Sequence, residues 1–189
     1  MRLPARWPTL VALVFCIYSW LLLWNAFSSH AQLKAAADVR IVADNDRSAA
    51  ALADFAVDRL NGATELADAP EIQNFLVNKA LGMSLKYGLS ANLDAIEVRF
   101  RQQMERKQLR GEPIYNRILF YDIDGQVLVD LSPGETPFRD ELSREAPTLS
   151  IFPEKRQIVA TAPVIYKGEM SGTVVTLGDL GQLSRYLIS

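Results

Sequence analysis

Residues that could carry out chemistry are scarce in this chain of 189 residues. It has one histidine, His30, and one cysteine, Cys16, which lies inside an apolar segment. A zinc site needs a set of cysteine, histidine or carboxylate ligands, and Ser-His or Cys-His catalysis needs a base beside a nucleophile. With no other histidine or thiol, these chemistries are nearly excluded, and the rest of the chain can form no disulfide.

A short acidic motif could be mistaken for a calcium loop. Asp122, Asp124 and Gly125 form an Asp-x-Asp-Gly string, but the later acidic ligands of an EF-hand loop do not follow it. Asp-Gly between two hydrophobic runs is instead a strong hairpin signal, because these residues supply the backbone geometry of the turn. We therefore expect a turn and no metal site.

Glu141 and Glu145 form an acidic pair one helical turn apart, which is also the spacing of ordinary solvated charges. Nothing in the sequence joins them to a nucleophile or to a set of metal ligands. We therefore predict no catalytic residue and no cofactor, and we do not expect the chain to be an enzyme. The net charge of −2 gives no support for nucleic acid as a partner.

An uncharged apolar segment lies near the N-terminus. Residues 9–29 are long enough to cross a hydrocarbon core as a helix, which takes about 20 residues. Arg2 and Arg6 precede the segment, so the positive-inside rule places residues 1–8 in the cytoplasm. We expect a single-pass protein of the inner (plasma) membrane, with its C-terminal domain periplasmic or extracellular.

A cleaved signal peptide is the alternative interpretation of the same segment. Ser29 and Ala31 are small residues at a suitable cleavage spacing. The apolar run is longer than the h-region of about 7–15 residues in signal peptides, which favours an uncleaved anchor. Both interpretations place the following domain outside the cytoplasm.

Helical patterns follow the apolar segment. Residues 30–60 predict a long stalk helix with a weak apolar stripe, which can pack on its own domain or on a second copy as a homodimer. Asn61-Gly62 is expected to end this helix, Pro70 to open the next one, and Ser90 to cap a third.

Strand patterns dominate from Tyr115 onward. A short helix is expected near residues 138–145, and a final helix is expected after its cap, Asp179. A run of hairpins gives an antiparallel sheet that the preceding helices cover, so we predict an α+β domain over residues 30–178 and a linker helix at 179–189. Five strands are predicted, at 115–121, 126–131, 148–152, 157–165 and 170–177.

Two segments resemble signatures of the Cache domains, which are PAS-like extracytoplasmic sensor folds of bacterial receptors. Residues 118–129 (ILFYDIDGQVLV) resemble their hairpin of two hydrophobic strands around Asp-x-x-Gly. Residues 158–176 (IVATAPVIYKGEMSGTVVT) resemble a second signature, a strand ending in Pro-Val, a turn with glycine, and a strand beginning with glycine. The order of elements is similar along nearly the whole chain.

The resemblance implies a five-stranded antiparallel sheet of order 2-1-5-4-3, in which strands 115–121 and 170–177 are the central neighbours. It also implies a small ligand, an organic acid or amino acid, on one face of that sheet. A cation is the natural anchor for such a ligand, and hydroxyl groups add hydrogen bonds. The alternative interpretation of each candidate is an ordinary side chain at the surface or at the edge of the core, with no ligand. The candidates are Arg117, Tyr121, Arg139, Thr161, Tyr166 and Lys167.

Members of this family usually feed a cytoplasmic transmitter through a second membrane helix. This sequence has no second apolar span and no kinase or cyclase motif. We therefore predict a sensor, the ligand-binding input domain of a two-component sensor histidine kinase or related receptor, and we favour a fragment over a stand-alone product. The alternative is a membrane-tethered interaction domain that dimerises through the stalk helix without sensing a ligand.

Overall fold

The computed structural model describes residues 7–109, 111–131 and 146–183. The chain divides into two compact units, Met1–Ala49 and Ala50–Ser189. In the first unit the described residues belong to helix α1 (Trp7–Ala67). Within the described ranges, no helix is both long and apolar enough to cross a membrane. The membrane helix included in the expected fold is therefore not confirmed, and the span at 9–29 stays a prediction.

The predicted end of the long helix at Asn61-Gly62 is wrong, because α1 continues to Ala67. Gly62 is buried, and a Cβ at this position would collide with the hydroxyl group of Tyr115. Burial of the last two turns against the core therefore outweighs the cost of about 1 kcal/mol that glycine imposes on a helix interior. The fully buried side chains of this stretch are Ala63, Leu66 and Ala67.

Two further helices, α2 (Pro70–Ala80) and α3 (Leu89–Arg106), are joined through the short 3-10 helix η1 (Leu85–Tyr87). Pro70 is the first residue of α2, as predicted. The predicted cap at Ser90 is wrong, because the N-cap of α3 is Gly88, two residues earlier, in the left-handed conformation with φ 119°. This turn brings Leu89 into the core, where it is buried.

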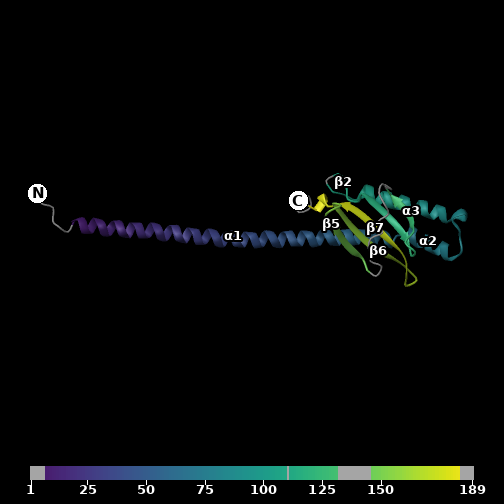
Figure 1. The fold of residues 1–189 in the computed structure, drawn as a ribbon, viewed down its shortest axis with the longest axis horizontal. Coiled ribbons are helices and arrows are strands. Elements are labelled where there is room, and N and C mark those ends of the chain that lie inside the picture. The colour runs from purple at the N-terminus through teal and green to yellow at the C-terminus, as the bar shows by residue number, and fades with distance from the viewer. Residues whose placement is uncertain (1–6, 110, 132–145, 184–189) are drawn as a thin grey trace. The chain divides into compact units, whose positions relative to one another are not determined.

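Five strands form one antiparallel sheet, in the spatial order β4-β3-β7-β6-β5 (Figure 1). The α+β class and the five-stranded antiparallel sheet are confirmed. The short helix expected near 138–145 lies outside the described residues. The strands are β3 (Arg117–Asp122), β4 (Val127–Leu131), β5 (Thr148–Phe152), β6 (Gln157–Tyr166) and β7 (Glu169–Asp179).

The strand labels differ from the expected order 2-1-5-4-3, because two short strands precede the sheet. β1 (Gln108–Leu109) and β2 (Glu112–Pro113) pair only with each other, in a separate two-stranded ladder. Strands this short leave no hydrophobic alternation in the sequence. Counted without them in chain order, the five strands lie second, first, fifth, fourth and third, and β3 and β7 are neighbours as expected.

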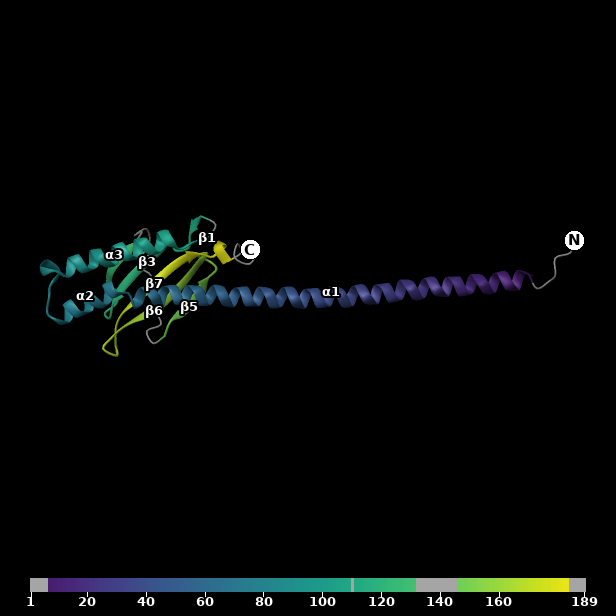
Figure 2. The same ribbon diagram turned by 180° about the vertical axis from the view of Figure 1, so that it is seen from behind.

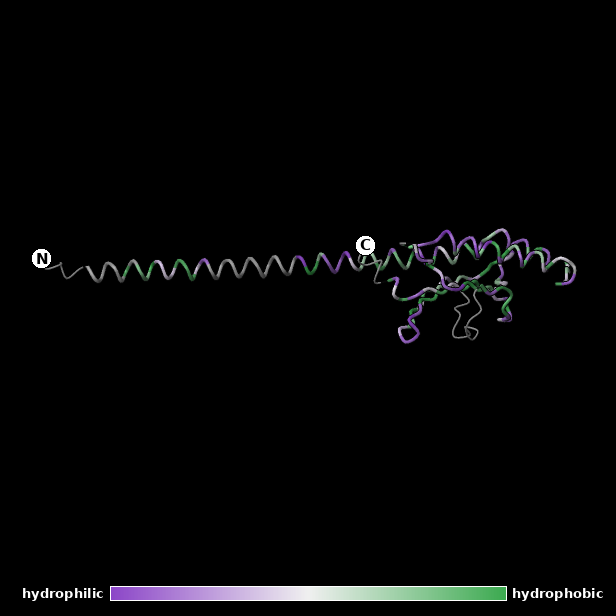
Figure 3. Tube along the Cα trace, turned by 90° about the horizontal axis from the view of Figure 1, so that it is seen from above, coloured by the Kyte–Doolittle hydropathy of each residue, from purple (hydrophilic) through white to green (hydrophobic). Residues whose placement is uncertain are grey.

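The two faces of the sheet pack differently. On one face, the side chains form the main core with α2, α3 and the C-terminal turns of α1, and Figure 2 shows these helices on that side of the sheet. Hydrophilic and hydrophobic residues alternate along these helices (Figure 3). A second cluster occupies the opposite face, which we call the far face; its members are Leu119, Tyr121, Val159, Val175 and Leu177, with Phe152 packed against them.

Candidate functional site

Three of the predicted ligand contacts share the far face. Side chains alternate between the faces of a strand, so Arg117 and Tyr121 of β3 lie on the same side as the clustered Leu119 between them. Thr161 of β6 pairs with Val175 of β7, and Val175 pairs with Leu119 in the same cross-strand row. The sheet therefore brings together residues that lie about 40 positions apart in the chain.

The far face buries polar groups among apolar ones. Tyr121 is 1 % exposed and Thr161 is 5 % exposed, and Thr173, which pairs with Tyr121, is 3 % exposed. The hydroxyl of Thr161 donates to the carbonyl oxygen of Thr148 at 3.5 Å. That distance is long compared with about 2.7–2.8 Å for a typical O–H···O bond, so the Thr161 hydroxyl can turn to a better partner at little cost.

Arg117 has an internal partner that the sequence pattern did not reveal. Its Nε and Nη2 donate to the two carboxylate oxygens of Asp130 on β4, at 2.9 and 2.6 Å. The two side chains are only 11 % and 18 % exposed. A bidentate pair of this kind holds the guanidinium in one orientation. A ligand carboxylate at Arg117 must therefore compete with Asp130.

Of the other predicted contacts, Tyr166 and Lys167 do not join this group. Arg139 lies outside the described residues. Tyr166 packs against the main core, on the helix side of the sheet. Lys167 is exposed in the β6–β7 turn with φ 52°, and its Nζ lies 5.3 Å from the ring centroid of Tyr166. This pair is therefore a feature of the turn rather than of the far face.

In the acidic turn between β3 and β4, the Asp122 carboxylate binds backbone groups of the turn itself. Oδ1 of Asp122 accepts the backbone N–H groups of Asp124 and Gln126, at 3.0 and 2.8 Å, and Gly125 has φ 79°. These bonds are the turn chemistry that Asp and Gly provide. The prediction of a hairpin turn at this motif is confirmed.

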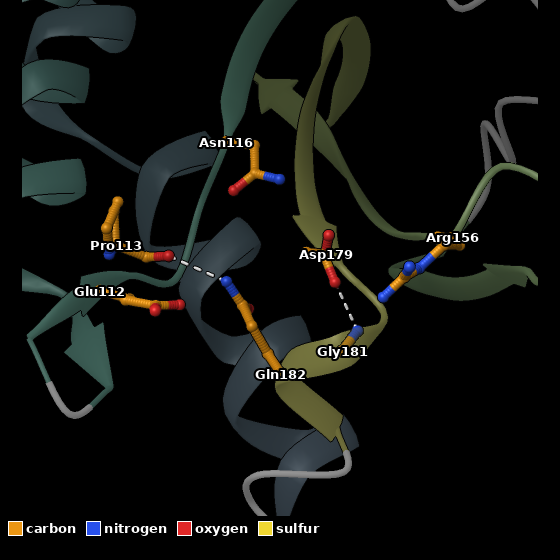
Figure 4. A pocket seen from close by; sticks show the side chains of 7 residues that line it. All are labelled: Glu112, Pro113, Asn116, Arg156, Asp179, Gly181 and Gln182. Carbon is orange, nitrogen blue, oxygen red and sulfur yellow. Dashed lines mark hydrogen bonds between the residues drawn. The ribbon is translucent and has the colours of Figure 1, made fainter.

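A pocket of about 320 Å³ lies at the end of the sheet where β7 stops (Figure 4). None of the predicted ligand contacts that the structure describes lines it. Its residues come from strand ends and turns that are distant in the sequence, so no local pattern could have indicated it. The lining residues are Glu112, Pro113, Asn116, Arg156, Asp179, Gly181 and Gln182.

Arg59 of α1 is buried beside this pocket, at 5 % exposure. Its Nη2 donates to Oε1 of Gln182 at 3.1 Å, and its Nη1 donates to the carbonyl oxygen of Ile114 at 3.4 Å. The guanidinium carbon lies 4.7 Å from the ring centroid of Phe55 and 5.6 Å from that of Tyr115. Stacking and hydrogen bonds together tie α1 to the segment that follows β7.

Tyr115 has a strongly perturbed acidity. Burial raises the pKa of its phenol to about 12, although the nearby charge of Arg59 acts in the opposite direction. Its hydroxyl oxygen is buried and has no hydrogen-bond partner among the residues that the structure describes. Tyr115 is therefore neutral at physiological pH, and its role is to fill space between α1 and the strands.

Comparison with known proteins identifies a structural relative. No protein-family model matches the chain, and no curated protein is similar to it. Among solved structures, the chain is similar to the sensor domain of the histidine kinase DctB from V. cholerae, with a TM-score of 0.49 and 15% sequence identity. The similarity covers 78% of this chain and 57% of that chain.

Proposed function

We propose that this chain is the ligand-binding input domain of a membrane-anchored extracytoplasmic sensor, and a fragment of a histidine kinase or related receptor. The observation that carries the proposal is the far face, where the hydroxyl groups of Tyr121, Thr161 and Thr173 are buried among apolar side chains. Small-molecule sites have this character, with a few convergent polar groups in mostly apolar surroundings.

The chemistry of the far face favours a small organic acid or amino acid. A ligand carboxylate can replace Asp130 as the bidentate partner of Arg117, but the Asp130 carboxylate, only 18 % exposed, then loses its cation, so the other contacts of the ligand must offset that cost. Tyr121 and Thr161 lie in adjacent cross-strand rows, so their hydroxyl groups can orient the same ligand. The ligand is held by an exchange of partners rather than by an unsatisfied cation, whose burial would be costly.

The sheet also offers a route by which a ligand on the far face acts on α1. Ile118 and Phe120 alternate with the far-face residues of β3 and belong to the same core cluster as Ala63 and Leu66 of α1. A shift of β3 on ligand binding therefore changes the packing of α1. We propose that this helix carries the shift toward the apolar segment at 9–29, the proposed membrane anchor.

A pair of matched threonine variants tests the site. The full chain, purified in detergent, is screened by isothermal titration calorimetry against small organic acids and amino acids. We expect a compound that binds the wild type to bind Thr161→Val about three to ten times more weakly, because one hydrogen bond is lost and the side-chain volume is kept.

The control is Thr176→Val, which makes the same change in the neighbouring central strand. Thr176 is equally buried but lies on the helix side, where its hydroxyl donates to the carbonyl oxygen of Ala160 at 3.4 Å. The affinity of Thr176→Val for the ligand should stay within about twofold of the wild type. Equal losses in both variants, or no binding by any compound of the screen, would count against the proposed function.

A further inference from the structure

The pocket at the end of the sheet gathers charged groups of both signs (Figure 4). Arg156 comes from the turn between β5 and β6, and Asp179 is the last residue of β7. Glu112 belongs to β2, and the exposed Asn116 immediately precedes β3. All four lie in the second unit, so the fold of that unit alone assembles the pocket.

Arg156 is held in an unfavourable backbone conformation at the rim of this pocket. Its φ is 51°, in the left-handed region that residues other than glycine, asparagine and aspartate rarely adopt. Its carbonyl oxygen accepts the backbone N–H of Leu180 at 2.8 Å, which fixes the turn against the segment after β7. The guanidinium forms no ion pair or hydrogen bond with any part of the chain that the structure describes. Backbone conformations of this kind cluster at functional sites, and the exposed guanidinium is accessible to a ligand.

Asp179 faces the same space with spare acceptor capacity. One of its carboxylate oxygens, Oδ1, accepts the backbone N–H of Gly181. A Cβ at residue 181 would lie 2.7 Å from that oxygen and 3.6 Å from Nη2 of Arg156. Glycine therefore keeps the space between the two charged groups open, although they form no ion pair with each other.

Gln182 forms a fixed wall of the pocket. Its Nε2 donates to the carbonyl oxygen of Pro113 at 2.8 Å, and its Oε1 accepts from Arg59 at 3.1 Å. The side chain is 5 % exposed. Because both ends of the amide are occupied, Gln182 shapes the pocket and leaves ligand binding to Arg156, Asn116 and Asp179.

We propose that this pocket binds a small molecule that carries both a carboxylate and an ammonium group. The carboxylate would pair with Arg156 and Asn116, and the ammonium group would lie against Asp179. The volume of about 320 Å³ is at the small end of the range for ligand pockets. Among the residues that the structure describes, no aromatic ring lines the pocket.

Calorimetric titration of the full chain in detergent, at low ionic strength, tests this site. The probes are glycine, β-alanine, 4-aminobutyrate and 5-aminovalerate, with acetate, butyrate, methylammonium and butylammonium as compounds that carry only one of the two charges. We expect at least one amino acid of the series to bind saturably, and at least about tenfold more tightly than the single-charge compounds.

Two neighbouring cations provide matched variants. Arg156→Gln should weaken binding of the amino acid by about tenfold or more, and Arg156→Lys should recover part of the loss because it keeps the charge. Lys155→Gln removes a charge from the same turn, but Lys155 does not line the pocket. The affinity of this variant for the amino acid should therefore stay within about twofold of the wild type. Since both positions are exposed, unchanged thermal unfolding is expected for all three variants.

The outcomes separate this site from the far face. Absence of saturable binding by every amino acid of the series, or equal losses in Arg156→Gln and Lys155→Gln, would overturn the proposal. Loss of binding in Thr161→Val with none in Arg156→Gln would place the ligand on the far face, which overturns this inference and supports the proposed function.

Discussion

At the scale of single residues, buried polar groups distinguish this domain from a purely apolar core. Tyr115 is the clearest case, because its hydroxyl is buried without a partner. Tyr115→Phe removes the unsatisfied group and keeps the ring that stacks near Arg59. We expect the free energy of unfolding to rise by about 1 kcal/mol at pH 8, measured by chemical denaturation. A loss of stability would show that the hydroxyl has a partner in solution.

The same variant makes a pH prediction with a definite sign. In the unfolded chain the phenol of Tyr115 titrates near the ordinary tyrosine pKa of 10.0, whereas burial raises the folded pKa to about 12. Between pH 10 and 12 the unfolded state therefore releases its proton first and gains stability relative to the fold. The stability advantage of Tyr115→Phe over the wild type should widen across this window, and a constant difference would contradict it.

At this scale the sequence indicates positions but not partners. The β-branched and aromatic residues of the predicted strands, with the turn signals between them, were enough to place Arg117, Tyr121 and Thr161 in a sheet. The pairing of Arg117 with Asp130 depends on strand register, which is set by the hairpin and its bulge between Phe120 and Tyr121. The pocket residues lie in turns and strand ends, where no periodic signal exists.

At the scale of elements, the α1–Tyr115 contact explains why a helix passes through Gly62. Gly62→Ala should gain helix propensity, about 1 kcal/mol, yet its Cβ collides with the Tyr115 hydroxyl. We therefore expect the variant to be destabilised in the wild-type background. In the Tyr115→Phe background the collision is relieved, so the same change should be neutral or stabilising. Chemical denaturation of the four proteins of this double-mutant cycle measures the coupling; additive effects would refute the contact.

The elements that the sequence predicted best are those with strong local signals. Pro70 opens α2 and Asp122 to Gln126 form the hairpin turn, because both depend on backbone chemistry within a few residues. The end of α1 was mispredicted because Asn-Gly is a turn signal that tertiary packing overrides. The β1–β2 ladder was missed because two-residue strands carry no pattern.

At the scale of the whole molecule, the succession of hairpins largely determines the sheet. β6 and β7, and β3 and β4, are sequential antiparallel neighbours. The long-range pairing of β3 with β7, by contrast, was expected only from the family resemblance, since local sequence contains no information on which distant strands meet. The local pattern therefore predicted the hairpins, and the family resemblance predicted the pairing of β3 with β7.

The orientation of the chain in a membrane is the remaining prediction at this scale. The uncharged segment at 9–29 follows Arg2 and Arg6, so we expect the N-terminus in the cytoplasm and the second unit outside. A C-terminal alkaline phosphatase fusion in a bacterial host should be active in the membrane fraction, because this enzyme folds only outside the cytoplasm, and a green fluorescent protein fusion should stay dark.

Changing both arginines, Arg2→Glu with Arg6→Glu, removes the charge bias without altering the apolar segment. This control should lower phosphatase activity and raise fluorescence, because the positive charges that hold the N-terminus inside are lost. Fluorescence of the unaltered chain with an inactive phosphatase would refute the orientation. N-terminal sequencing of the fusion decides between anchor and signal peptide, since cleavage after Ala31 would start the mature chain at Gln32.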